Sequence, residues 1–159
     1  MKIEFRITRD LLQEIHNDLD RPHPVALERV GYISCACARL PNSGLLLLAQ
    51  KYHPVADTNY LPGPAGATIN SAAIRHAMTI AFTAKNAIFH VHRHEHLGRP
   101  GFSRIDAREN AKLVPDFFKV RPELPHGALV LSHDSAYGMC WFNPQDAIAI
   151  DTFTLVGSM

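Results

Sequence analysis

The stretch from residue 87 to residue 106 reads Ala-Ile-Phe-His-Val-His-Arg-His-Glu-His-Leu-Gly-Arg-Pro-Gly-Phe-Ser-Arg-Ile-Asp, and it joins a strand to the start of a helix. The apolar residues 87–89 predict the strand, and Gly98 and Pro100 predict the loop that follows it. Ser103 stands where it can cap a helix, with Asp106 in the first turn. A strand that leads through a loop into a helix is a building unit of layered folds that mix strands and helices.

The histidines at the end of this strand predict a metal site. Side chains at alternate positions of a strand point to the same side, so His90 and His92 can both reach one ion. Asp106 supplies a third ligand from the helix. Catalytic zinc is typically held by three such protein ligands, which leave a fourth position open for water. We therefore predict a Zn²⁺ site formed by His90, His92 and Asp106.

The run contains more histidines than such a site requires. His92 and His94 form a competing ligand pair, and His94 with His96 forms a third pair that we favour less. We prefer His90 and His92 because the apolar strand ends directly before them. On this assignment, His94 and His96 support the ligands, contact the substrate or remain solvated.

The overall composition narrows the class of protein. The chain has 159 residues and a formal net charge of +1, which predicts one domain over 1–159 and gives no basic field to attract nucleic acid. The longest apolar run, 45–49, is too short to cross a bilayer, and the first residues lack the apolar core of a signal peptide. The three cysteines make no disulfide framework. We expect a cytoplasmic protein with no nucleic-acid or membrane partner.

Hydrophobic periodicity outside the histidine run predicts the remaining elements. The expected strands are 2–7, 30–38, 45–55, 127–131, 137–142 and 147–155, and the expected helices are 9–19, 70–85 and 103–113. Thr8 caps the first helix, and Pro115 stops the last one. The inner face of the middle helix is expected to carry Ile74, Ala77, Met78, Ala81 and Phe82. The loop 57–67 is rich in Pro and Gly and is a candidate wall of a substrate channel. This pattern predicts an α/β (α+β) fold with a single mixed sheet flanked by helices.

These motifs together resemble the JAB/MPN, or JAMM, zinc metalloprotease family, in particular its compact prokaryotic members. The family pattern is a Glu at the entry to a strand, followed by His-x-His and then Ser-x-x-Asp. Glu28 precedes the strand that begins at Val30, and residues 90–92 and 103–106 match the two later motifs. The chain departs from the family in one respect, because ten residues separate His92 from Ser103, more than is usual.

The resemblance implies the JAB/MPN (cytidine-deaminase-like) fold and a role for each matched residue. Glu28 would act as general base and acid, and Ser103 would help to stabilise the oxyanion. Glu95 and Glu109 are rival bases. The implied activity is cleavage after the C-terminal Gly of a ubiquitin-like protein, by deconjugation or precursor processing, in a bacterial ubiquitin-like conjugation system with E1-like and E2-like enzymes. The alternatives are processing of a sulfur-carrier protein and a metal-free, MPN-type binding scaffold.

Overall fold

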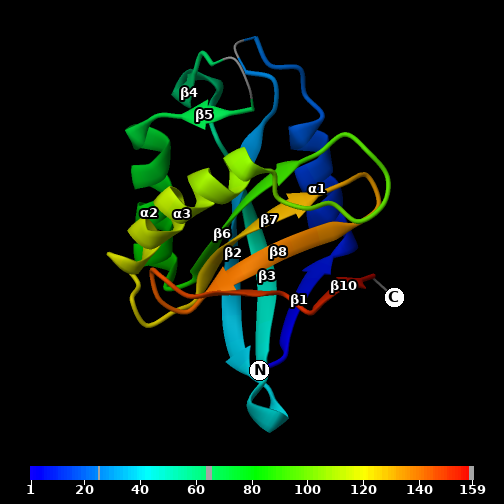
Figure 1. Cartoon of the computed structure of the whole chain (residues 1–159), viewed down its shortest axis with the longest axis vertical. Helices are drawn as coiled ribbons and strands as arrows, with labels where there is room; N and C mark the ends of the chain where they lie inside the picture. The colour runs from blue at the N-terminus through cyan, green and yellow to red at the C-terminus, as the bar shows by residue number, and fades with distance from the viewer. Residues whose placement is uncertain (25, 64–65, 158–159) are drawn as a thin grey trace.

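A curled sheet of eight strands runs through the computed structural model, which describes residues 1–24, 26–63 and 66–157 (Figure 1). The strands of this sheet are β1 (Ile3–Thr8), β2 (Val30–Arg39), β3 (Leu45–Pro54), β6 (Ala87–Arg93), β7 (His126–Leu131), β8 (Ala136–Trp141), β9 (Ala147–Ala149) and β10 (Thr152–Val156). The short strands β4 (Tyr60–Leu61) and β5 (Thr68–Ile69) form a separate antiparallel pair. The helices are α1 (Arg9–Leu19), α2 (Ser71–Ala84) and α3 (Arg104–Phe118).

The strand order is β10-β1-β3-β2-β6-β7-β8-β9, and the sheet is mixed. β1 runs parallel to both β10 and β3, and β6 runs parallel to β7. The other neighbouring pairs are antiparallel, including β2 with β3, which follow each other along the chain. β6 therefore lies at the centre of the sheet, with β2 on one side and β7 on the other.

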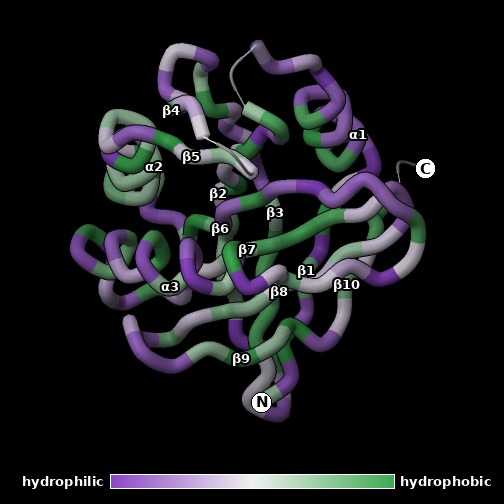
Figure 2. Tube along the Cα trace, turned by 45° about the horizontal axis from the view of Figure 1, so that its top comes forward, coloured by the Kyte–Doolittle hydropathy of each residue, from purple (hydrophilic) through white to green (hydrophobic). Residues whose placement is uncertain are grey.

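Helices cover both faces of this sheet. The buried side of α1 packs on one face through Leu11, Ile15 and Leu19, as the helical spacing of these residues predicts. α2 and α3 pack on the other face and share a second apolar core with β2, β6 and β7. Figure 2 shows the apolar character of β7, and its residues contribute to both cores, Leu129 to the first and Ala128 to the second. Among the described residues, no helix is long and apolar enough to cross a membrane.

The segment between β9 and β10 connects the two ends of the sheet. The Ile150 N–H donates to the Gly138 carbonyl on β8, and the Asp151 N–H donates to the Ile3 carbonyl on β1. The Ile3 N–H in turn donates to Asp151 Oδ2 over 2.6 Å. These contacts curl the sheet toward closure. The prediction of one strand over 147–155 is therefore wrong, because the chain changes its pairing partner from β8 to β1 at residues 150 and 151.

Two helix predictions also need correction. α3 does not stop at residue 113 but continues through Pro115 to Phe118. A proline inside a helix removes one hydrogen bond, and the burial of Phe117 and Phe118 beyond it offsets that loss. On α2 the buried residues are Ala73, Ala77 and Ala81, whereas Phe82 is 61% exposed. The small side chains let α2 approach the sheet closely, and Phe82 lies outside that contact beneath the Arg121 guanidinium.

Candidate metal centre

β6 sends its side chains alternately to the two faces of the sheet. Phe89 and Val91 lie in the core under α1, and Arg93 at the end of the strand reaches His16 of α1. His92 therefore points to the opposite face, toward α3. The His94 N–H donates to the Leu131 carbonyl of β7 over 2.8 Å, so pairing continues one residue beyond the strand. This continuation brings the side chain of His94 to the same side as that of His92.

Asp106 is fixed by the first turn of α3. Ser103 is the N-cap residue, and its side chain accepts a hydrogen bond from the Asp106 N–H over 3.1 Å. The Asp106 carboxylate accepts the Ser103 N–H over 2.8 Å in return. This reciprocal capping box holds the carboxylate against the start of the helix, where the helix dipole favours negative charge.

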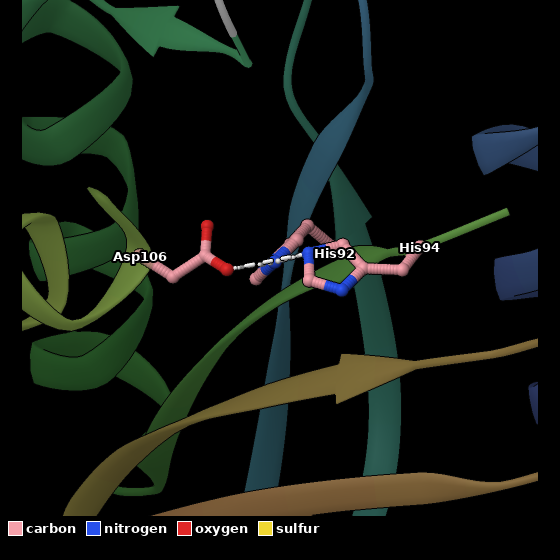
Figure 3. A group of neighbouring side chains, drawn as sticks. All are labelled: His92, His94 and Asp106. Atoms are coloured by element: carbon pink, nitrogen blue, oxygen red, sulfur yellow. Dashed lines mark hydrogen bonds and ion pairs between the residues drawn. The ribbon is translucent and has the colours of Figure 1, made fainter. Parts of the chain in front are cut away.

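His92, His94 and Asp106 meet above the end of β6 (Figure 3). The Nε2 atoms of the two histidines are 3.2 Å apart. The Asp106 Oδ2 atom lies 3.3 Å from His92 Nε2 and 3.2 Å from His94 Nε2. The three atoms therefore form a nearly equilateral triangle, with His92 buried and the other two residues partly exposed.

With Asp106 ionised, every protonation state of the two imidazoles leaves one contact of this triangle unfavourable. Both histidines must carry a proton on Nε2 if each is to donate to the carboxylate, and the two N–H groups then face each other as donors. If one Nε2 is left unprotonated, that nitrogen faces the carboxylate as a second acceptor. A cation at the centre makes all three contacts favourable, because each atom then directs a lone pair at it.

The size of the triangle fits zinc. A tetrahedral Zn²⁺ ion with bonds of about 2.0 Å holds its ligand atoms about 3.3 Å apart. Two imidazoles and one carboxylate are also donors that zinc accepts. His92 Nδ1 is buried without a hydrogen-bond partner among the described residues, so no carboxylate or carbonyl orients this ring from behind.

The structure brings together the competing histidine pair rather than the preferred one. His90 lies two residues before His92 on β6. Its ring packs against that of Tyr32, with 5.7 Å between the ring centroids. Its Nδ1 atom is buried and has no hydrogen-bond partner in the described part of the chain. Burial lowers the pKa of His90 to about 3. His96 is exposed in the loop beyond the site. Strand pairing continues beyond His92. For this reason the histidine that joins His92 beside Asp106 is His94 and not His90.

The carboxylate of Glu28 borders the same cleft as His94 and Asp106, a hollow of about 670 Å³. Burial raises the pKa of Glu28; the charge of Asp106 adds to this effect, and His92 and His94 oppose it. Gly66 lies against this carboxylate with φ +63°, and a Cβ atom there would stand 3.0 Å from Glu28 Oε1. The glycine therefore allows the loop before β5 to approach Glu28 closely.

Arg29 and Tyr60 fix the segment that carries Glu28. The buried Arg29 guanidinium donates to the carbonyls of Arg21 and Pro22 and to Asp57 Oδ1. The Tyr60 hydroxyl accepts the Val30 N–H and donates to the Val30 carbonyl. Neither residue was predicted from the sequence. An arginine directly before a predicted buried strand was the available signal, because such a cation must find partners when it is buried.

The remaining site predictions fall into two groups. Ser103 lines the cleft at the helix start, with its hydroxyl beside Asp106. Of the two rival bases, Glu95 also lines the cleft, where it pairs with Arg93 and His133, and the exposed Glu109 lies outside it and pairs with Lys112. Glu28 and Ser103 thus both line the cleft, and Glu28 differs from Glu95 in being partly buried and in forming no ion pair with a cation among the described residues.

No family model matches this chain, and no curated protein matches it in sequence. The fold is mixed α/β with helices on both faces of one large sheet. The character of the candidate site follows from its own residues and their geometry.

Proposed function

We propose that the protein is a zinc-dependent isopeptidase or peptidase with a JAB/MPN-type fold, which cleaves after the C-terminal Gly of a ubiquitin-like protein. One observation carries this proposal. The triangle formed by His92, His94 and Asp106 fits zinc, and a partly buried carboxylate, that of Glu28, borders the same cleft. A metal beside a carboxylate of raised pKa is an arrangement that supports amide hydrolysis by water.

His92, His94 and Asp106 would hold the zinc, in place of the pair His90 and His92. Eight residues then separate the second histidine from Ser103, which is closer to the family spacing than ten. Zinc bound at such a site acts as a Lewis acid and lowers the pKa of water to about 7.

The other residues of the cleft supply the proton transfers and the oxyanion contact. Glu28 accepts a proton from the attacking water and later delivers it to the leaving amine, and its raised pKa suits both steps. The Ser103 oxygen accepts the Asp106 N–H, and its hydroxyl hydrogen remains available to the oxyanion that forms on the substrate carbonyl.

The residues that line the cleft are compatible with an extended substrate. Gly66 lies against the Glu28 carboxylate, and the first turn of α3 lines the same cleft. A C-terminal Gly-Gly tail has no side chains that would need room beside these residues. This substrate implies E1-like and E2-like pathway partners and a cytoplasmic setting, and a sulfur-carrier protein with a similar tail is the alternative substrate.

The test uses a ubiquitin-like protein fused through its C-terminal glycine to a reporter. Zinc-loaded protein should cleave the fusion, and Glu28→Gln should lower the rate about 100-fold or more, because general acid–base catalysis contributes 10²–10⁴-fold. Bound zinc should be unchanged in this variant. Glu109→Gln, an exposed rival base on α3, serves as the matched control and should retain the rate of the wild type.

Two results would contradict the proposal. Unchanged cleavage by Glu28→Gln would remove Glu28 from the mechanism. A purified protein that takes up no zinc, even after zinc is added back, would favour the metal-free scaffold instead.

A further inference from the structure

A second cleft lies between α1, the β7–β8 end of the sheet and β10. It encloses about 620 Å³, and none of its lining residues lines the candidate metal centre. Apolar side chains from distant parts of the chain form its walls, among them Leu12 of α1, Leu131 of β7 and Phe153 of β10. The volume is in the range of pockets that bind small molecules.

Two arginines border this apolar cleft. The Arg9 guanidinium, at the start of α1, lies close to Gly157 beyond the end of β10. The Arg99 guanidinium lies 5.5 Å from the centroid of the Tyr137 ring on β8. Both arginines are exposed, and in the described part of the chain neither forms an ion pair with a carboxylate. Two exposed guanidinium groups that contact no carboxylate among the described residues thus line an apolar hollow.

The two carboxylates in the cleft already have donors. Asp134 Oδ1 accepts the Gly98 N–H over 2.8 Å and the Ser132 hydroxyl over 3.2 Å. Asp151 Oδ2 accepts the Ile3 N–H over 2.6 Å. These carboxylates are held by the fold, whereas the two guanidiniums keep their donors for another acceptor. The free guanidinium donors therefore favour an anionic group beside the arginines and an apolar body against the apolar walls.

We propose that this second cleft binds a small amphipathic carboxylate. The hydrolysis proposed for the metal centre does not use this cleft. The carboxylate group lies between Arg9 and Arg99, and the hydrocarbon body lies against Leu12, Leu131 and Phe153. Arginine is suited to this role because its planar guanidinium can donate two parallel hydrogen bonds to a carboxylate.

The experiment is isothermal titration calorimetry of the full-length protein with octanoate. Octanoate should bind with a stoichiometry of one, and acetate, which lacks the apolar body, should bind at least tenfold more weakly. Octan-1-ol, which lacks the charge, should also bind at least tenfold more weakly. The double variant Arg9→Gln/Arg99→Gln should lose at least tenfold in affinity for octanoate. Arg75→Gln, which removes an exposed cation on α2, is the matched control and should bind like the wild type.

The same titration on Asp106→Asn separates the cleft from the metal centre, where a carboxylate could also bind. Unchanged octanoate affinity in Asp106→Asn places the ligand in the second cleft. Loss of binding in that variant, equal affinity in the double arginine variant, equal affinity for octan-1-ol, or no binding up to the solubility limit of octanoate would each overturn the proposal. These outcomes are independent of whether the protein cleaves any substrate.

Discussion

Histidines of one short run have different surroundings, although their side chains are identical. His92 and His94 face Asp106, whereas His90 is packed against Tyr32. The sequence shows the spacing of these residues but not the position at which the strand ends. Since that position depends on pairing between His94 and Leu131 of β7, a contact distant in sequence selects the histidines beside Asp106.

Zinc binding should therefore depend on His94 and not on His90. Purified His94→Ala should contain far less than one zinc ion per chain, because one corner of the triangle is lost. His90→Ala removes an imidazole from the same strand and is the matched control, which should keep its zinc. Elemental analysis after gel filtration measures both variants. The reverse result would restore His90 and His92 as the ligand pair.

His126 is a buried histidine with a purely structural position. Its Nδ1 atom accepts the Ile88 N–H over 3.1 Å, and its Nε2 atom donates to the Arg121 carbonyl over 2.9 Å. Both ring nitrogens are engaged only when the imidazole is neutral with the proton on Nε2. Burial lowers the pKa of His126 to about 4.

This depressed pKa predicts a loss of stability in acid. Between pH of about 6.5 and about 4, the unfolded chain binds a proton at His126 that the folded protein does not. The free energy of unfolding should therefore fall as the pH drops through this interval, by up to about 1.4 kcal/mol per pH unit from this residue. His126→Asn lacks this contribution, so urea unfolding should show a smaller difference between wild type and variant at low pH than at neutral pH.

The exposed His76 on α2 provides the control for this measurement. His76→Asn should follow the wild type across the whole pH range. A difference between the wild type and His126→Asn that does not change with pH would show that protonation of His126 does not couple to unfolding.

α3 shows how packing extends a helix beyond its local signals. The sequence predicts an end before Pro115, and the helix continues to Phe118. Phe117 is fully buried in the core shared with α2 and the sheet. Local propensity cannot indicate this contact, because it depends on strands that are distant in sequence. By contrast, the start of α3 was predictable, since Ser103 and Asp106 form their capping box within four residues.

Replacement of Phe117 should be far more costly than replacement of Phe82. Phe117→Ala leaves a cavity in the core and should lower the free energy of unfolding by roughly 3–5 kcal/mol. Phe82 is 61% exposed and contacts the Arg121 guanidinium, so Phe82→Ala should cost about 1 kcal/mol or less. Chemical denaturation of both variants tests this difference. Equal losses would contradict the assignment of Phe117 to the inner face.

The segment between β9 and β10 curls the sheet as a whole, and no local sequence pattern predicts this connection. The residues from 147 to 155 alternate well enough to predict one strand, yet the chain leaves β8 and joins β1 partway along. Alternation of apolar and polar residues indicates which side chains of a strand are buried, but it does not indicate which strand pairs with it. The mixed α/β class, the longer strands and the helix starts were therefore predictable from the sequence, whereas the short strands β4 and β5, the division between β9 and β10 and the order of the strands were not.

Asp151 should hold β10 in place. Asp151→Ala leaves the buried Ile3 N–H without its acceptor, which should lower the free energy of unfolding by about 1–3 kcal/mol. Amide hydrogen exchange in β10 should accelerate first. Asp151→Asn keeps an oxygen acceptor and should lie closer to the wild type. Equal exchange rates in β10 for all three proteins would indicate that this link does not hold the strand.

The alternation along β6 has a consequence for how this chain can vary in length. His92 and His94 face one side of the sheet, and Arg93 between them faces the other, where it pairs with Asp20 and Glu95. A single inserted residue just before His92 would exchange the two faces and present a guanidinium to Asp106. Extra residues after His94 leave this parity intact. Natural or engineered variants should therefore tolerate changes in the length of the loop between His94 and Ser103. Within β6 they should tolerate insertions of two residues but not of one.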